Sequence, residues 1–366
     1  MTKPTKTQSA TPNPVPPREN VLNINLILLG IVAVFVTGVI LLQLKSVLLP
    51  FVIAVLLSII FSPMVASLKR RKIPTALSLL VVLLALALVL FLVSLLIYSS
   101  TESFIHEMPK YEQRVTAIGD TLVATVNQAA SDLGIDLEQI EWSQAFQLSS
   151  FTSALTSGVG TFLNFMTNLF LILLFMLFIL AGSGDLENKI REAFPPHQAA
   201  RIAKIIHNIG DRVRQYLMTK TLVSAAAGIM VFLVLWATGV DFPLVWGFLT
   251  FLLHFIPNIG SIIAVIFPVA LAYLQFDGGG RPLLVLILLS IVQMAMGNIV
   301  EPKLMAFRLN LSALFVLVSL IFWGWLWDVW GMILAVPLMA TVKIICENVD
   351  SLRPVSVLMG GSIEQP

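Results

Sequence analysis

Long apolar stretches dominate the chain and predict helices that cross a membrane. Seven stretches of 16 to 24 residues carry few charges; they occupy residues 26–43, 75–98, 162–181, 221–238, 282–297, 311–327 and 330–346. A helix satisfies all of its own backbone groups, so it can cross lipid without closing into a barrel. The pattern therefore predicts an all-α integral membrane protein with about seven to eight transmembrane helices.

Two further apolar stretches, residues 46–61 and 243–275, are interrupted or bounded by proline. In the second, 13 residues separate Pro243 from Pro257. That length gives roughly 20 Å of helix, against a hydrocarbon core of about 30 Å. We expect a short Pro-broken or re-entrant hairpin with its tip at residues 257–260. Paired Pro-interrupted segments in two halves of a chain are typical of a transporter's binding region. Proline is also frequent in membrane helices in general, so we assign a functional role to 243–275 alone.

Two other segments have the periodicity of amphipathic helices. Apolar residues recur at spacings of three and four in residues 101–133, with acidic residues between them. This pattern predicts an extracytoplasmic helix whose apolar face packs on itself or on neighbouring subunits. A second stripe, from Ile202 to Leu217, lies opposite basic residues, which predicts a helix on the anionic cytoplasmic leaflet.

Composition supports the membrane assignment, and the distribution of charge predicts its sidedness. The 366 residues are 58% hydrophobic and 11% charged, with a mean hydropathy of +0.94; an average soluble domain has about 25% charged residues. Residues 69–72 are all basic, and residues 182–220 contain seven Lys or Arg against four Asp or Glu. Residues 99–160 contain two basic against eight acidic residues. The positive-inside rule puts the first two segments in the cytoplasm and the third outside.

These observations predict seven regions along the chain. They are a disordered basic cytoplasmic tail (1–20), the first membrane helices with a Pro-interrupted hairpin (21–98), an extracytoplasmic helical segment (99–160), a membrane helix (161–181), a cytoplasmic amphipathic helix (182–220), a membrane transport core with the hairpin 243–275 (221–346) and a cytoplasmic tail (347–366).

Polar and helix-breaking residues in the C-terminal half are candidates for a transport pathway: Pro257, Asn258, Gly260, Gln293, Asn298 and Glu301. A carboxylate in or beside hydrocarbon is costly and marks a pathway, and broken helix ends form polar sites in transporters. Glu301 precedes Pro302, so capping of a helix start at the membrane surface is the alternative role. The candidate coupling or gating residues are Asp241, His254 and Asp328.

Catalytic and cofactor motifs are weak or missing. The only cysteine, Cys346, excludes an intrachain disulfide, and the four histidines are too far apart in sequence to indicate a local metal site. Residues 182–185 match the GxGD of intramembrane aspartyl proteases, but the expected second aspartate motif does not occur in another span. We therefore expect no enzymatic activity, no cofactor, no bound metal and no nucleic-acid partner.

Four segments resemble the autoinducer-2 exporter family of bacterial membrane proteins: Phe255–Ser261, Gly297–Met305, Phe322–Trp327 and Gly331–Leu338. The likeness runs from about Leu48 to Met359. It departs from the family pattern at Ala306 and at Asp328–Gly331. The resemblance implies a multi-pass secondary transporter of the bacterial inner membrane. It also implies a homo-oligomer, a pentamer.

Three functions are compatible with these features. The first is export of a small polar metabolite such as the quorum-sensing signal autoinducer-2, with membrane lipid around the protein. The second is sodium/proton antiport, in which Glu301 or Asp241 would alternate between the two cations. The third is a non-transporting oligomeric membrane scaffold that recruits partners through residues 101–133.

Overall fold

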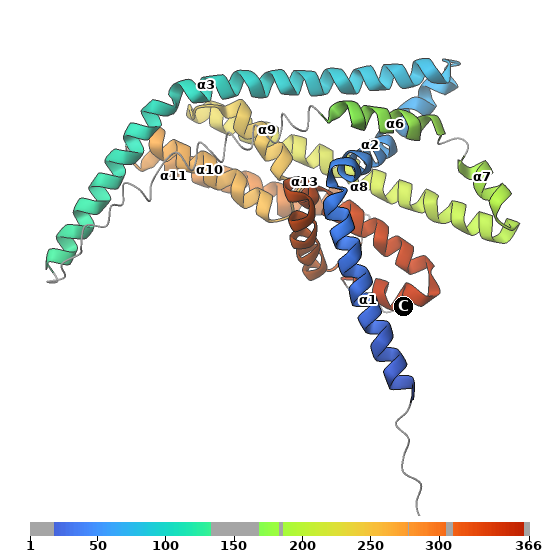
Figure 1. Cartoon of the computed structure of the whole chain (residues 1–366). Coiled ribbons are helices and arrows are strands. Elements are labelled where there is room, and N and C mark those ends of the chain that lie inside the picture. Colours follow the sequence, from blue (N-terminus) through green and yellow to red (C-terminus); the bar gives the residue numbers. More distant parts are fainter. Residues whose placement is uncertain (1–17, 133–167, 183–185, 277, 305–309, 362–366) are drawn as a thin grey trace, which may run out of the picture. The chain divides into compact units, whose positions relative to one another are not determined.

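A computed structural model of the chain describes residues 18–132, 168–182, 186–276, 278–304 and 310–361. The described residues form helices joined by short connections (Figure 1). In chain order these are α1 Arg18–Gln43, α2 Lys45–Arg70, α3 Thr75–Asp132, α6 Leu169–Gly182, α7 Leu186–Ala193, α8 Pro196–Thr238, α9 Pro243–Leu253, α10 Ile259–Gln275, α11 Gly280–Ala295, the π-helix η1 Met296–Val300, α12 Glu301–Leu304, α13 Ala313–Asn348, the 3₁₀-helix η2 Asp350–Leu352 and α14 Arg353–Leu358.

Several of these helices are long and apolar enough to cross a membrane. Among the described residues there are five: Lys45–Arg70, Thr75–Val93, Pro196–Thr238, Gly280–Leu304 and Ala313–Asn348. Together α6 and α7 make a sixth if this pair, bent by 59°, is one span. Shorter apolar helices occupy Leu28–Gln43, Pro243–Leu253 and Ile259–Gln275. The predicted all-α membrane architecture is confirmed, and the total of seven to eight spans stays a prediction.

Residues 1–48 and 49–366 form two units. The helix α1 belongs to the first unit and begins at Arg18, so the last three residues of the predicted disordered tail are helical. Residues 1–17 of that tail lie outside the described residues.

The helix α2 corrects the expectation that residues 46–61 form a Pro-broken segment. It is continuous over 26 residues, with Pro50 and Pro63 inside it. Each proline removes one backbone hydrogen bond from a helix interior, and neighbouring helices in a membrane protein make this tolerable. In the second unit, Ala54 and Val65 of α2 pack in a buried cluster with residues of α3 and α6, including Val82 and Met176.

Two helices are far longer than a bilayer is thick. The 43 residues of α8 span roughly 64 Å and the 58 residues of α3 roughly 87 Å at 1.5 Å per residue. The predicted cytoplasmic helix ending at residue 220 and the predicted span starting at 221 are parts of one continuous helix, α8. The amphipathic and apolar patterns therefore share one helix. Likewise, the amphipathic residues 101–132 continue the apolar start of α3.

The helix α13 contains a turn where the prediction placed the junction of two spans. Asp328 has a φ of 54°, a left-handed value that is uncommon for a residue with a side chain. The turn brings Gly331 against Trp323: a Cβ on this glycine would lie 1.8 Å from the Trp323 carbonyl oxygen. Leu320 and Ala335, on the two sides of the turn, share one buried cluster. The two arms of α13 thus fold against each other.

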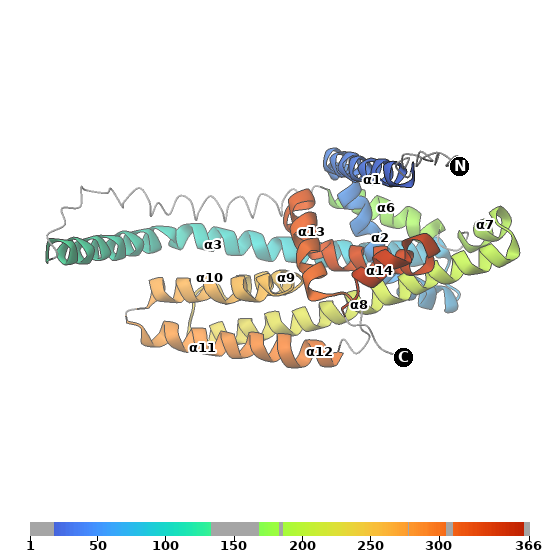
Figure 2. The same ribbon diagram turned by 90° about the horizontal axis from the view of Figure 1, so that it is seen from below.

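The helices α8, α9, α10 and α11 form the core that positions the candidate site. Figure 1 and Figure 2 both show α10 and α11 running side by side, and α8 contacts α9 and α11. Their buried cluster includes Leu235, Trp246, Leu271 and Leu289. Tyr111 of α3 belongs to the same cluster. One residue of the predicted amphipathic stripe in 101–133 therefore packs on the chain's own core.

Candidate functional site

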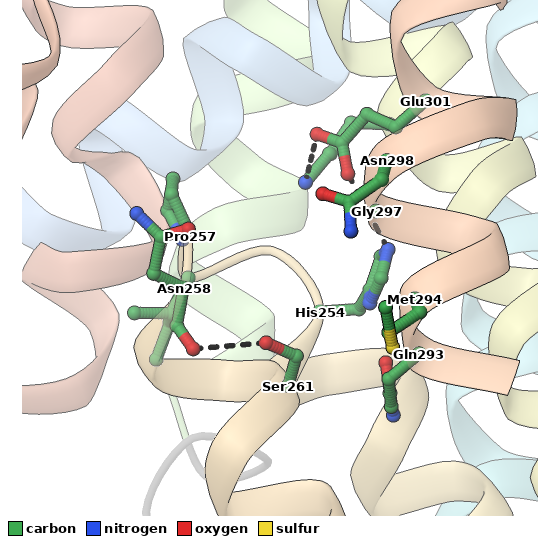
Figure 3. A pocket seen from close by; sticks show the side chains of 11 residues that line it. His254, Pro257, Asn258, Ser261, Gln293, Met294, Gly297, Asn298 and Glu301 are labelled. Atoms are coloured by element: carbon green, nitrogen blue, oxygen red, sulfur yellow. Dashed lines mark hydrogen bonds and ion pairs between the residues drawn. The ribbon is translucent and has the colours of Figure 1, made fainter. Parts of the chain in front are cut away.

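A cavity of about 290 Å³ lies among α8, the α9–α10 connection and the end of α11. Its lining is polar for a site among apolar helices, and Figure 3 shows the side chains from close by. The lining residues are Lys220, His254, Ile256, Pro257, Asn258, Ser261, Gln293, Met294, Gly297, Asn298 and Glu301. Amide, hydroxyl, imidazole, ammonium and carboxylate groups therefore face one space.

One wall of the cavity is the break between α9 and α10, residues 254–258. Asn258 has φ 62° and ψ −52°, and the N–H of Ile259 donates to the carbonyl of Pro257 at 2.7 Å. This is the geometry of a γ-turn, a strained backbone conformation that clusters at functional sites. Ser261 Oγ donates to the Asn258 carbonyl at 2.9 Å. The break thus presents polar backbone groups where a continuous helix would have none.

Gly260 makes this break possible but does not line the cavity. It is buried, and a Cβ at this position would lie 1.7 Å from the carbonyl oxygen of Leu253. Any side chain would therefore force α9 and α10 apart. Gly260, a candidate pathway residue, therefore allows the close contact between α9 and α10 at this turn.

The opposite wall comes from a local change of helix type. At the end of α11 the chain forms the π-helix η1, and the N–H of Glu301 donates to the carbonyl of Met296, five residues earlier. Pro302 follows and has no N–H to donate, so it removes the next regular bond. Such π-turns are frequent at functional sites. Gly297 and Asn298, both within η1, line the cavity.

A buried ion pair crosses the cavity. Lys220 Nζ of α8 lies 2.5 Å from Glu301 Oε1, and His254 Nε2 lies 3.5 Å from Glu301 Oε2. Lys220 is 2% exposed, His254 5% and Glu301 23%. A charge placed in a membrane helix is costly unless it is paired. The carboxylate and the ammonium group neutralise each other at the site.

Lys220 was not among the predicted site residues, because it was counted with the basic residues of a cytoplasmic helix. Its position in a buried stripe of α8 was the available signal: Val213, Leu217, Lys220, Ser224 and Ala227 are all buried and recur at intervals of three and four. A lysine inside such a stripe needs a buried partner. Ile256, Ser261, Met294 and Gly297 were also missed.

The structure brings five predicted pathway residues to one cavity: Pro257, Asn258, Gln293, Asn298 and Glu301. His254, a predicted coupling or gating residue, joins them and contacts Glu301. In Figure 3 the labelled residues of α11 and its continuation run from Gln293 to Glu301, with Asn258 and Ser261 across from them. Asp241 and Asp328 do not line this cavity.

Asp241 lies instead in the α8–α9 connection, where it contacts α3 and α10. The hydroxyl of Tyr111 donates to Asp241 Oδ2 at 2.5 Å, and Gln275 Nε2 donates to Asp241 Oδ1 at 3.0 Å. Burial, together with the hydrogen bond to Asp241, raises the pKa of Tyr111 above its ordinary range. Lys220 precedes the end of α8 by 18 residues, or roughly 27 Å. The Asp241 contacts are therefore at the other end of the core.

Asp328 lies at the turn of α13, where its side chain is exposed. The neighbouring Trp327 is buried, whereas Trp325 is largely exposed. Among the described residues, no group of three or more His, Cys, Asp or Glu is placed to hold a metal ion.

A polar cavity with a buried ion pair, among apolar helices of membrane length, is the candidate solute site of a multi-pass membrane protein. Comparison with known sequences narrows that class. The profile of the AI-2E family of transporters matches residues 28–351. The chain belongs to the AI-2E family of transporters, and it is thereby a member of a family of membrane transport proteins.

Relatives match nearly the whole chain. The AI-2 transport protein TqsA of Escherichia coli K12 is 33% identical over 337 residues, which cover 91% of this chain and 94% of TqsA. A candidate transport protein of Haemophilus influenzae is 31% identical over 344 residues, 93% of this chain and 98% of its own length. The candidate transport protein YhhT of Escherichia coli K12 is 31% identical over 320 residues, 86% and 88% of the two chains.

Proposed function

We propose that the protein is a secondary transporter that exports a small polar metabolite, such as autoinducer-2, across the bacterial inner membrane. The observation that carries this proposal is the cavity of about 290 Å³ among apolar helices, lined by amide and hydroxyl groups around a neutralised ion pair. The similarity to a relative named for AI-2 transport supports this choice of solute.

The chemistry of the lining favours an uncharged solute with hydroxyl or carbonyl groups. Lys220 and Glu301 cancel each other's charge, so the cavity has no strong preference for an anion or a cation. Asn258, Asn298 and Gln293 supply amides that both donate and accept hydrogen bonds. A polar solute that leaves water for this space can exchange its hydrogen bonds with water for bonds to the lining.

Sodium/proton antiport is the second candidate, and one contact favours it. The Glu301 carboxylate faces the cavity and is approached by two groups that can carry a proton, Lys220 and His254. A sodium ion would have to displace Lys220 from that carboxylate to bind there. Antiport then requires the pair to open during each cycle, whereas export of a neutral solute does not.

One assay separates these two functions. Liposomes that contain the full-length protein are loaded with labelled autoinducer-2. Efflux of the label is measured under a sodium gradient, and a pH-sensitive dye reports proton movement in the same liposomes. We expect efflux of the label that requires the protein, without sodium-driven proton movement. Proton movement driven by sodium without efflux of the label would favour antiport and contradict the proposal.

A cavity variant tests whether the solute passes through this site. Asn298→Ala removes an amide from the lining, and we expect efflux to fall roughly three- to tenfold, the effect of one hydrogen bond to an uncharged group. The matched control is Asn208→Ala on α8, outside the cavity lining. Equal efflux from the two variants would remove the cavity from the path.

The placement of the protein in the membrane forms part of this proposal. The N-terminus, residues 182–220 and the C-terminus are cytoplasmic, and residues 99–160 are extracytoplasmic, because basic residues concentrate on the cytoplasmic side. We also propose a homo-oligomer of five subunits. Crosslinking of the protein in native membranes would test it, and a ladder that ends at one or two subunits would contradict it.

A further inference from the structure

Three buried polar side chains, one of which lines the cavity, lead from the cavity into the helix core. Ser224 of α8, Thr250 of α9 and Gln293 of α11 are 0%, 1% and 8% exposed. Among the described residues, neither hydroxyl oxygen and neither amide atom of Gln293 has a hydrogen-bond partner. Buried polar groups nearly always have partners in native proteins, so a cluster without them needs an explanation.

Helix geometry puts these three side chains on the same side of the ion pair. Ser224 follows Lys220 by four residues, so it lies one turn from Lys220 on the same face of α8. Thr250 precedes His254 by four residues, so it lies one turn from His254 on the same face of α9. The chain reverses between α8 and α9, and both steps therefore lead toward the α8–α9 connection. Gln293 of α11 precedes Glu301 by eight residues, about two helical turns back through η1 in that same direction, and it also lines the cavity.

The row of polar atoms continues one turn further and then ends in apolar packing. Trp246 precedes Thr250 by four residues, and its buried indole N–H also has no partner among the described residues. At this level α8 and α9 approach closely at Gly228 and Gly247: a Cβ on Gly228 would lie 2.6 Å from the Gly247 carbonyl oxygen. The polar row thus leads from the cavity into the closed part of the core.

We propose that Ser224, Thr250 and Gln293 form a second binding layer that accepts the hydroxyl or carbonyl groups of an uncharged solute moving out of the cavity. This inference rests on the transport function proposed above. All three side chains are uncharged and can both donate and accept hydrogen bonds. A charged solute would have no counter-charge in this layer, whereas a hydroxylated solute would satisfy the atoms that lack partners.

Two serines with the same burial provide a matched test. Ser78 of α3 is also 0% exposed and its hydroxyl also lacks a partner among the described residues, but it does not line the cavity. In a Cys346→Ala background, Ser224→Cys and Ser78→Cys are treated in liposomes with 2-hydroxyethyl methanethiosulfonate, a small uncharged hydroxylated reagent. We expect Ser224→Cys to react at least roughly tenfold faster, because the proposed layer is reached by such solutes.

Equal rates at the two positions, or no reaction at Ser224→Cys, would overturn the proposal. If Ser224→Cys does not fold, Thr250→Cys takes its place, since Thr250 faces the same layer. The labelling does not depend on the identity of the natural solute. If the wild-type protein does not export autoinducer-2 but the two cysteine variants differ in labelling rate, autoinducer-2 is excluded as the solute and the second binding layer is still supported.

Flux measurements test the hydrogen bonds themselves. Ser224→Ala and Thr250→Val remove buried hydroxyls that have no partner within the described part of the chain, so thermal stability should stay equal or rise. If the hydroxyls bind the solute, the half-saturation concentration for autoinducer-2 efflux should rise roughly three- to tenfold in each variant. Ser78→Ala should leave that value unchanged. Unchanged half-saturation in all three variants would overturn the second layer.

Discussion

At the scale of single residues, the pairing of Lys220 with Glu301 changes how Glu301 is tested. Glu301→Gln removes a negative charge and leaves the ammonium group of Lys220, which is 2% exposed, without its partner. Breaking a buried ion pair from one side costs about 3 kcal/mol or more. A loss of transport in that single variant would therefore combine a functional effect with a structural one.

We predict that the double variant Lys220→Met, Glu301→Gln recovers most of the stability that either single variant loses, because no unpaired buried charge remains. The expected order of melting temperatures is wild type close to the double variant, with both single variants several degrees lower. Thermal unfolding in detergent measures this order.

Efflux measured on the same proteins then separates two roles of Glu301. A purely structural pair predicts that the double variant also recovers transport. A carboxylate that takes part in transport predicts a stable double variant with little efflux. If the double variant is less stable than both single variants, the ion pair is not the interaction that makes the single substitutions costly.

At the scale of elements, the contact of α8 with α9 depends on two glycines. A Cβ on Gly228 would lie 2.6 Å from the Gly247 carbonyl oxygen, and one on Gly247 would lie 2.8 Å from the Gly228 carbonyl oxygen. Both contacts are with backbone atoms, which cannot move aside as a flexible side chain can. Small residues at helix crossings in membranes allow this kind of close approach.

We predict opposite effects of one substitution at two positions of α8. Gly228→Ala should lower the free energy of unfolding by about 1–3 kcal/mol, because the methyl group separates the helices. Gly210→Ala has nothing within 4 Å of the new Cβ, so the better helix propensity of alanine should raise stability by about 0.5–1 kcal/mol. Thermal unfolding of both variants measures the contrast, and a stabilising Gly228→Ala would contradict the close crossing.

The contact of α3 with the core depends on Tyr111 and Asp241. Tyr111→Phe removes a hydrogen bond to a carboxylate, and we predict a loss of about 1.5–3 kcal/mol in stability. The pKa of Tyr111 is raised by burial and by Asp241, so the folded protein holds this proton more tightly than the unfolded chain does. The stabilisation that the Tyr111 hydroxyl provides is therefore complete below pH 10, the ordinary pKa of tyrosine, and it declines as the pH rises above that value.

Melting curves of the wild type and of Tyr111→Phe from pH 6 to pH 11 test this dependence. The difference between the two proteins should be constant up to about pH 9 and should shrink above pH 10. A difference that shrinks on acidification toward pH 6 would point to another group.

At the scale of the whole molecule, the two long helices extend beyond the bilayer on opposite sides in the proposed topology. That topology puts the amphipathic part of α3 outside the cytoplasm and the first part of α8 in the cytoplasm, from the distribution of Lys and Arg. Two alanines with exposed side chains, Ala124 on α3 and Ala200 on α8, allow matched single-cysteine variants in a Cys346→Ala background.

We predict that an impermeant maleimide added to whole cells labels Ala124→Cys and leaves Ala200→Cys unlabelled until the cells are opened. The physical reason is the excess of Lys and Arg in residues 182–220 over that in 99–160. The reverse pattern would invert the topology and put the cavity at the other face of the membrane.

Hydrophobic patterning was sufficient to predict an all-α membrane protein and to place most of its apolar helices. It succeeds because lipid imposes the same requirement on every span: an apolar surface, and a backbone bonded within its own helix. It also selected Pro257, Asn258, Gln293, Asn298 and Glu301, which the structure brings to one cavity. Polar groups and prolines are energetically costly and therefore rare in apolar stretches, so they can be recognised in the sequence alone.

Which of those groups touch depends on the packing of helices distant in sequence. Lys220 and Glu301 are 81 residues apart, and Tyr111 and Asp241 are 130 apart, so no local pattern pairs them. The continuity of α2 through two prolines was likewise not predicted from the sequence. Local propensity sets a cost for a proline or a charge within a helix. Contacts with neighbouring helices determine whether that free-energy cost is offset, and these contacts exist only in the folded chain.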